Sequence, residues 1–346
     1  MITVDGAYGE GGGQVLRTAL SLAAITGQGF RLEHIRARRP DPGLHAQHLT
    51  AVHAVAELCD AELEGAELGS RTVTFLPRSL PRPGHYRWDV GTAGSTTLIL
   101  QAVLWPLALA DGPSSVELLG GTHVAWSPPA DYVRDVYLWM LAQATGRVLA
   151  HLEVGCWGWY PLGGGQLSVQ IYGGTEIASL RVLERGALRQ VSVLSAASNL
   201  PGHIVERQAL RAESCLRKQG IVPRVEVLES PSPGKGTVVF ILAEYEHTRA
   251  GFTAYGRLRK PAEEVAEEAC RAFVRYHRRG QPVDQHLGDQ LLLPMALAHG
   301  TTEYAVSVVT QHLLTSAWLI GHFLTVEVSV SGKERNTGVV AIRTSS

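Results

Sequence analysis

The sequence predicts an α+β protein in which helices pack on sheets, with a smaller domain inserted into a larger one. The first observation is that strand-like and helical stretches alternate along most of the chain. The second is that residues 182–276 differ from their surroundings, because two helices there carry most of the charge. We therefore expect a discontinuous catalytic domain formed by residues 1–181 and 277–346, and an inserted domain formed by residues 182–276.

Three helices are expected in the larger domain, over residues 13–26, 44–59 and 95–110. The first stops at Gly27, a residue type typical of the position after a helix. Ser95 or Thr96 is expected to cap the third. That helix is almost wholly apolar but is interrupted by Gln101 and Pro106, and it has about half the length needed to span a membrane. It is therefore interpreted as a buried helix. The strands expected between these helices include residues 72–76 and 115–119.

In the inserted segment, strands are expected at 190–194, 225–228 and 237–243, and helices at about 203–219 and 261–277. The run 231–236 is expected to be a flexible, hairpin-like loop. Glycine-rich runs at 9–13, 91–94 and 163–165 are interpreted as traces of duplicated sheet-and-helix units.

Composition excludes several classes of protein. The net charge of −1 gives no overall attraction for nucleic acid, so any such contact has to be local. The four cysteines form no CxxC pair, which disfavours a zinc ribbon or a thioredoxin-like site. Met1 leads directly into the strand-like residues 2–4, without a signal sequence. We expect a cytoplasmic protein that has no membrane anchor.

The first candidate site is the run Gly9–Arg17, in which Glu10 precedes three glycines, Gln14 and Arg17. Glycines let the backbone approach an anion, and a helix N-terminus offers free N–H groups to it. A carboxylate, an amide and a guanidinium together suit a metal ion and a phosphate. The alternative is a glycine turn with a surface ion pair. The run does not match the Walker A motif.

The second candidate is Arg36 to Arg39, beside a rigid Pro/Gly turn and followed by Gln47 and His48. Arginine side chains bind phosphate through paired donors. A solvated basic turn is the alternative. The third candidate is the turn 91–96, which precedes the helix that carries Gln101. Gln101 is interpreted as either a core amide, which is the more common case, or a ligand contact.

The fourth candidate lies near the C-terminus. Residues 286–290 open a helix, and a strand at 304–309 leads to Thr310 and His312. With Thr310 as the N-cap, His312 lies in the first helical turn. The positive end of the helix disfavours the imidazolium, so the ring is expected to stay neutral with a free lone pair. The alternative is a histidine that caps the helix or belongs to the core.

Taken together, these stretches resemble the RNA 3′-terminal phosphate cyclase family. The motifs that carry the resemblance extend along essentially the whole chain: GEGGGQVLR at 9–17, IRARRPDPGL at 35–44, QHL at 47–49, GTAGST at 91–96, GGTH at 120–123, PPADY at 128–132, YPLGGG at 160–165, DQLLLPMALA at 289–298 and QHLLT at 311–315. The combination is highly specific, whereas each motif alone is only moderately so.

The resemblance implies repeated βαβαββ units, similar to the architecture of the enolpyruvate transferases. It also implies an inserted domain similar to the C-terminal domain of translation initiation factor three. His312 would be the nucleophile that becomes adenylylated, and Glu10 would bind Mg²⁺ or Mn²⁺. The residues implied to hold the adenosine part of ATP are Gln101, Pro128, His286, Leu287, Gly288, Asp289 and Gln290. Those implied to line the phosphate path are Gln14, Arg17, Arg36, Arg39, Gln47 and His48.

The implied activity is the ATP-dependent conversion of an RNA 3′-phosphate into a 2′,3′-cyclic phosphate, through a covalent histidine–AMP intermediate. One alternative is a non-catalytic relative that acts as a scaffold in RNA processing, but such relatives lack the nucleophile. Another is an enzyme similar to an enolpyruvate transferase, which has no use for His312. The cellular RNA and the oligomeric state are left open.

Two positions depart from the family pattern. His286 stands where a tyrosine is common, and a histidine ring stacks on adenine with less area. Asp41 stands where a basic or neutral residue is common. Its charge would weaken phosphate binding at the neighbouring arginines unless the side chain points to solvent.

Overall fold

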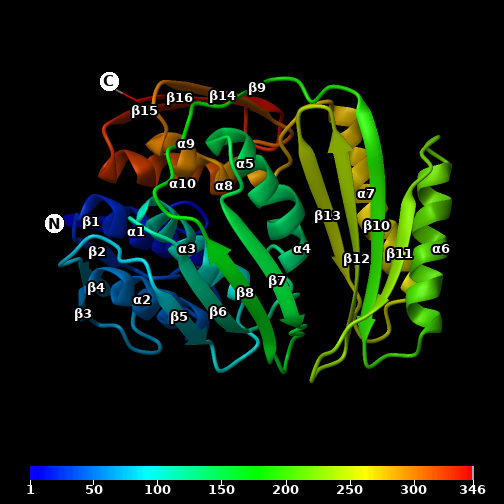
Figure 1. Ribbon diagram of the computed structural model, residues 1–346, viewed down its shortest axis with the longest axis horizontal. Helices are drawn as coiled ribbons and strands as arrows, with labels where there is room; N and C mark the ends of the chain where they lie inside the picture. Colours follow the sequence, from blue (N-terminus) through cyan, green and yellow to red (C-terminus); the bar gives the residue numbers. More distant parts are fainter. Residues whose placement is uncertain (345–346) are drawn as a thin grey trace.

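The computed structural model describes residues 1–344 and contains four sheets of four strands each, packed with helices (Figure 1). Three of the sheets belong to units that repeat one topology, βαβαββ, with the same strand order. In each unit the first two strands are parallel, and the last two pair antiparallel to the sheet. The α+β class with repeated βαβαββ units is thereby confirmed.

The first unit comes from the N-terminal part of the chain and has the sheet order β1-β2-β4-β3. Its elements are β1 (Ile2–Asp5), α1 (Gly13–Thr26), β2 (Phe30–Glu33), α2 (Ala46–Cys59), β3 (Glu62–Glu64) and β4 (Val73–Leu76). The expected bounds of α1 are confirmed, and Gly27 follows it with the left-handed φ of 70°.

The second and third units repeat this pattern. The second consists of β5 (His85–Asp89), α3 (Thr96–Leu109), β6 (Ser114–Gly120), α4 (Ala130–Tyr132), the π-helical turn η1 (Val133–Tyr137), α5 (Leu138–Thr145), β7 (Ala150–Cys156) and β8 (Gly165–Ile171). The third consists of β9 (Arg181–Val182), α8 (Leu287–Gln290), α9 (Leu292–Leu297), β14 (Thr301–Val306), α10 (Gln311–Phe323), β15 (Val326–Ser331) and β16 (Gly338–Thr344).

The glycine runs mark these repeats only in part. The runs at 9–13 and 91–94 both precede the first helix of a unit, as expected. The run at 163–165 instead lies between the last two strands of the second unit, where Gly163 and Gly164 turn the chain with φ values of 68°. The interpretation of this third run as a repeat marker is therefore wrong.

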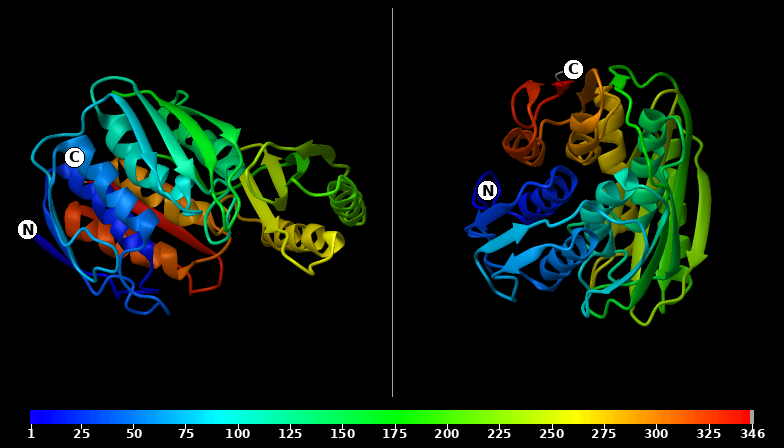
Figure 2. Two further views of the ribbon diagram at one scale, coloured as in Figure 1. Left: turned by 90° about the horizontal axis from the view of Figure 1, so that it is seen from below. Right: turned by 60° about the vertical axis from the view of Figure 1, so that its left-hand side comes forward.

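Between β9 and α8 the chain forms a separate layer, which stands beside the three units in Figure 2. Its elements are β10 (Leu188–Ser198), α6 (His203–Arg217), β11 (Arg224–Glu229), β12 (Gly236–Tyr245), β13 (Arg249–Tyr255) and α7 (Ala262–Arg279). Its sheet has the order β11-β10-β12-β13, and it has a hydrophobic core of its own. We propose that this layer is the inserted domain. Its last helix extends past residue 276, where the domain was expected to end.

Two expectations within this layer are wrong. The loop 231–236 does not close a hairpin, because β11 and β12 both pair with β10, on opposite sides of it. The strand β13 was not anticipated. It pairs antiparallel with β12 and completes the sheet.

The helices α1, α2, α3 and α10 pack against one another between the sheets and form much of the main core. Ser95 caps α3, with its Oγ accepting from Leu98 N at 3.4 Å. The nearly continuous apolar sequence of α3 is explained by its burial between α1 and α2. In the part of the chain that the structure describes, no helix combines the length and the apolar character that crossing a membrane requires.

Candidate active site

His312 lies in the first turn of α10, as expected. Thr310 is the N-cap, and its Oγ1 accepts from Leu313 N at 3.1 Å. The imidazole is half-buried and faces the N-terminal end of α1. Two helix N-termini therefore meet at this ring, and their unpaired N–H groups favour an anion between them.

Gln14, in the first turn of α1, fixes the orientation of this ring. The Gln14 Nε2 atom lies 3.0 Å from the carbonyl oxygen of His312, 2.5 Å from Ser316 Oγ and 3.3 Å from Asp289 Oδ2. Because these acceptors hold the amide nitrogen, the amide oxygen faces His312 Nδ1. In a neutral ring, Nδ1 is then the protonated nitrogen and Nε2 keeps its lone pair.

Glu10 and Arg39 lie on the open side of His312. The Glu10 Oε2 atom is 3.2 Å from His312 Nε2 and 3.3 Å from Arg39 Nη2. The pKa of His312 is lowered mainly by burial, and further by Arg17 and Arg39, while the Glu10 carboxylate acts in the opposite direction. The expectation of a neutral ring was based on the helix terminus, whereas burial is the largest cause.

Asp289 and Arg17 form the floor of the site. Burial raises the pKa of Asp289 to about 7, although the positive charge of Arg17 opposes this shift. Burial also lowers the pKa of Arg17 to about 10, so it remains a cation at neutral pH. The two groups place a permanent positive charge and a titrating carboxyl below the His312 ring.

His48 packs against the start of α1. Its Nδ1 accepts a hydrogen bond from His45 N at 3.2 Å, so the neutral ring carries its proton on Nε2. A Cβ atom at Gly13 would lie 2.3 Å from His48 Nε2, which shows how closely the ring approaches the helix. Burial, with the charge of Arg17, lowers the pKa of His48 to about 3, so the ring is a neutral donor.

Gln47 and Arg36 also hold local structure. Gln47 Oε1 accepts from Ser95 N at 2.9 Å and so joins α2 to the start of α3. Arg36 Nη1 donates to the carbonyl oxygens of Asp41 at 2.7 Å and Gly43 at 3.1 Å. Arg36 has a φ of 54°, and these bonds hold the turn in which it lies.

The Asp41 carboxylate points away from the site. It is 83% exposed and pairs with His45 at 2.9 Å. This is the orientation in which the departure from the family pattern has least effect on the neighbouring arginines.

The residues expected to hold adenosine come from two segments that the fold joins. Tyr132 donates its hydroxyl proton to Asp284, and Asp284 accepts from the backbone of His286 at 2.8 Å. Pro128 lies at the start of α3, where its carbonyl accepts from Thr97 Oγ1 at 2.7 Å.

The remaining residues of this group differ in exposure. Gln101 is one turn along α3 from Thr97 and is partly exposed, while Leu287 and Gly288 are buried. His286 is exposed. The Oε1 atom of Gln290 is buried without a hydrogen-bond partner among residues 1–344, which leaves an acceptor free in this segment.

A cation fits beside Glu10. Within residues 1–344 no three His, Cys, Asp or Glu side chains gather as a protein-built metal site. Mg²⁺, however, is commonly held by one or two carboxylates together with substrate phosphates. In the neutral ring, the lone pair of His312 Nε2 faces the Glu10 carboxylate at 3.2 Å, and a proton or a cation would relieve this repulsion.

Sequence reasoning missed several residues that support the site. Arg38 was noted only as part of the arginine cluster, yet its Nη1 donates to Gly9 O at 2.8 Å and anchors the glycine turn. Asp284 and Tyr132 are far apart in the sequence, so no local pattern reveals their contact. Ser316 had a usable signal, because it lies four residues after His312 on the same helical face.

Comparison with known proteins gives consistent matches. The model of the family described as RNA 3′-terminal phosphate cyclase matches residues 8–330. Curated relatives named RNA 3′-terminal phosphate cyclase include those of Methylococcus capsulatus and Trichormus variabilis. They are 50% and 47% identical, covering 99% of this chain in both cases and 96% and 100% of the relatives. That of Pyrococcus furiosus is 40% identical, covering 99% of this chain and 98% of the relative.

Among solved structures, the enolpyruvyl transferase NikO from Streptomyces tendae aligns with 99% of this chain and 82% of its own. The TM-score is 0.27 and the sequence identity 10%.

Proposed function

Because the chain belongs to the RNA 3′-terminal phosphate cyclase family, we propose that it converts the 3′-phosphate of RNA into a 2′,3′-cyclic phosphate at the expense of ATP, through a covalent AMP on His312. The observation that carries this proposal is the hydrogen bond between Gln14 and His312. It directs the proton to Nδ1 and leaves Nε2 as a nucleophile in a pocket of positive potential.

In the first step, His312 Nε2 attacks the α-phosphorus of ATP. A P–N bond forms, the bond to the bridging oxygen breaks, and pyrophosphate leaves. Gln14 holds the Nδ1 proton throughout, so the positive charge that develops on the ring is shared with the amide oxygen. Arg17 and the helix N-termini stabilise the negative charge on the phosphate oxygens.

In the second step, a terminal oxygen of the RNA 3′-phosphate attacks the same phosphorus and displaces His312, giving an RNA–AMP anhydride. In the third step, the neighbouring 2′-OH attacks the RNA phosphorus and expels AMP. The 2′-OH loses its proton and the cyclic phosphate forms. This requirement for a 2′-OH restricts the cyclisation to RNA.

Glu10 is the residue that would hold Mg²⁺ or Mn²⁺, which when bound neutralises charge on the transferring phosphate. Arg39 is 3.3 Å from the same carboxylate and provides a second, permanent positive charge at the mouth of the site. Arg39 and His48 are the residues we assign to the RNA phosphate. Arg36 contributes by holding the turn that positions Arg39.

Incubation with ATP labelled at the α-phosphate tests the proposal. The wild-type protein should acquire covalent label that is labile to acid and to hydroxylamine, as expected for a phosphoramidate. His312→Ala should acquire none. His322→Ala is the matched control, because His322 is an exposed histidine near the end of the same helix. It should label like the wild type.

The rival functions predict different results. A non-catalytic scaffold would bind RNA but acquire no label, and an enzyme similar to an enolpyruvate transferase would neither label nor cyclise RNA. Label that persists in His312→Ala would assign the nucleophile to another residue.

A further inference from the structure

Four loops meet at one end of the molecule, at the bottom of Figure 1, where β7, β8, β12 and β13 begin or end. Trp157 N donates to Pro231 O at 2.8 Å, and Gly256 N donates to Thr237 O at 2.8 Å. These bonds join loops of the second unit to loops of the inserted layer. We call this surface the loop rim, and it consists of residues 121–129, 157–164, 231–235 and 256–261.

The loop rim is continuous with the candidate active site. A Cβ atom at Gly163 would lie 2.6 Å from Thr92 O, so the rim is in contact with the turn that precedes α3. In that turn Ser95 N donates to Gln47, the neighbour of His48. The rim therefore borders the side of the site assigned to the RNA phosphate. It is separated from His312 by the starts of α3, α2 and α1.

The loop rim presents aromatic side chains to solvent. Trp126 is 99% exposed and has a φ of 66°, a strained conformation for a bulky residue. Tyr160 is 77% exposed. Fully exposed tryptophan is uncommon because its large apolar surface favours burial. Exposed rings of this kind are the platforms on which the bases of single strands stack.

The charge of the loop rim has one sign. None of the four loops contains Asp or Glu. Lys235, Arg257 and Arg259 are exposed and form no ion pair with any described residue. Elsewhere in the inserted layer, Arg207 binds Glu263 at 2.8 Å, and so its charge is neutralised locally. The unpaired charges of the rim remain available to a polyanion.

We propose that the loop rim binds the single-stranded segment of RNA that precedes the reactive 3′-phosphate. Trp126 and Tyr160 would stack its bases, and Lys235, Arg257 and Arg259 would contact its phosphates. The proposal rests on the proposed function, because it takes the ligand to be the RNA whose end reaches His312.

Geometry favours a chain over a single nucleotide. ATP has to place its α-phosphate at His312, and the starts of three helices lie between that ring and the loop rim. A ligand that occupies both places needs several linked units. Alternating rings and cations, with no carboxylate among them, match a single-stranded nucleic acid more closely than a protein partner.

Substrate length gives the test. Transfer of AMP to a 12-nucleotide RNA with a 3′-phosphate is compared with transfer to a dinucleotide with the same end. In Trp126→Ala and in Arg257→Ala/Arg259→Ala, kcat/KM for the 12-mer should fall roughly 10-fold or more. Values for the dinucleotide and for self-adenylylation should match the wild type. In the arginine variant, the salt dependence of 12-mer binding should weaken by about 0.7 per lost phosphate contact.

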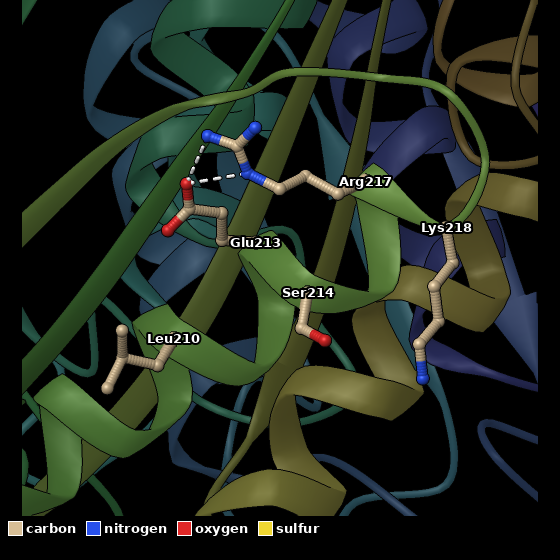
Figure 3. A pocket seen from close by; sticks show the side chains of 5 residues that line it. All are labelled: Leu210, Glu213, Ser214, Arg217 and Lys218. Carbon is tan, nitrogen blue, oxygen red and sulfur yellow. Dashed lines mark hydrogen bonds and ion pairs between the residues drawn. The ribbon is translucent and has the colours of Figure 1, made fainter.

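Lys218→Ala is the matched control. Lys218 is an exposed cation of the same layer, and Figure 3 shows its side chain extending freely beside a shallow hollow on α6. It should bind the 12-mer like the wild type. Thermal unfolding of all variants should coincide with the wild type, since the substituted side chains are exposed.

Three outcomes would overturn the inference: equal loss with both RNA lengths, loss of self-adenylylation, or no change with the 12-mer. Failure of the proposed function is separate, because it appears as a wild-type protein that acquires no AMP. In that case, binding of a fluorescent 12-mer without ATP still measures the effect of the rim variants. A rim that does not bind the 12-mer would leave a protein partner as the explanation for its exposed rings.

Discussion

Gln14 and His312 face each other across the N-terminal ends of α1 and α10, although 298 positions separate them in the chain. The amide nitrogen of Gln14 is held by α10 itself, through the carbonyl of His312 and the hydroxyl of Ser316. The glutamine thus contacts the backbone and the ring of the same histidine. This arrangement fixes the nitrogen that bears the proton as well as the direction of the ring.

Gln14→Ala should therefore slow self-adenylylation without unfolding the protein. Loss of the partner that orients a reacting group typically costs on the order of 10–100-fold in rate. The measurement is the rate at which α-labelled AMP accumulates on the protein. Gln28→Ala is the control, because Gln28 joins the opposite ends of the same two helices through Phe323 O at 2.9 Å. Equal rates in the two variants would remove Gln14 from the reaction.

Gly13→Ala should disrupt the site through packing. The added methyl group would lie 2.3 Å from His48 Nε2, so the buried ring has to move. Overpacking of this kind costs about 1–3 kcal/mol in the free energy of unfolding. Gly321→Ala offers the opposite case, since Gly321 is in α10 and a Cβ atom there meets nothing within 4 Å. It should stabilise by about 0.5–1 kcal/mol, as alanine does in helices. Urea unfolding distinguishes the two, and a neutral Gly13→Ala would contradict the close approach of His48.

Asp289 should make stability depend on pH. Its pKa is about 7 in the folded protein, against an ordinary value of 3.8. Between these values the folded state retains a proton that the unfolded chain has released, so the free energy of unfolding falls as pH rises. Above about pH 7 this contribution becomes flat.

The comparison is between wild type and Asp289→Asn, which has no such proton. The difference in their free energies of unfolding should decrease by about 1–3 kcal/mol from pH 5 to pH 7. Denaturant titrations at several pH values measure it. Parallel pH profiles would show that Asp289 titrates normally.

Arg36 and Arg39 should separate a structural role from a chemical one. Arg36→Ala removes two hydrogen bonds within its turn and should cost about 1–3 kcal/mol of stability. Arg39 forms a partly exposed pair with Glu10, so Arg39→Ala should change stability by at most about 1 kcal/mol.

The reaction steps should show the reverse order. Arg39→Ala should slow AMP transfer to RNA more than it slows self-adenylylation. Quenched single-turnover assays resolve the two steps. If Arg39→Ala impairs the first step as strongly as the second, the side chain belongs to the ATP site.

Local features of the site could be predicted from sequence because their signals are local. The glycine after α1 and the Thr310 cap of α10 both follow from residue type and spacing. The role of Arg36 could not be predicted, because its acceptors depend on the path of the turn. The third glycine run was misleading, since glycine turns occur in several settings and only the strand order distinguishes them.

Long-range relationships show the same limit. The loop rim combines four segments of the chain, and each alone is an unremarkable polar loop. Their shared lack of carboxylates becomes meaningful once the fold places them together. The strand β13 was missed because Gly251 and the small residues around it weaken the strand pattern.

The position of the inserted layer between β9 and β14 determines the order in which the protein can be completed during synthesis. Arg181 in β9 binds Glu303 beside β14 at 3.2 Å, and 122 positions separate them. The first two units end at Ile171 and have all their strands once that residue has emerged, whereas β9 waits for the whole inserted layer. His312 then follows β14. A nascent chain can thus be largely folded while it is still chemically inert, and the nucleophile meets Gln14 only when the last unit closes.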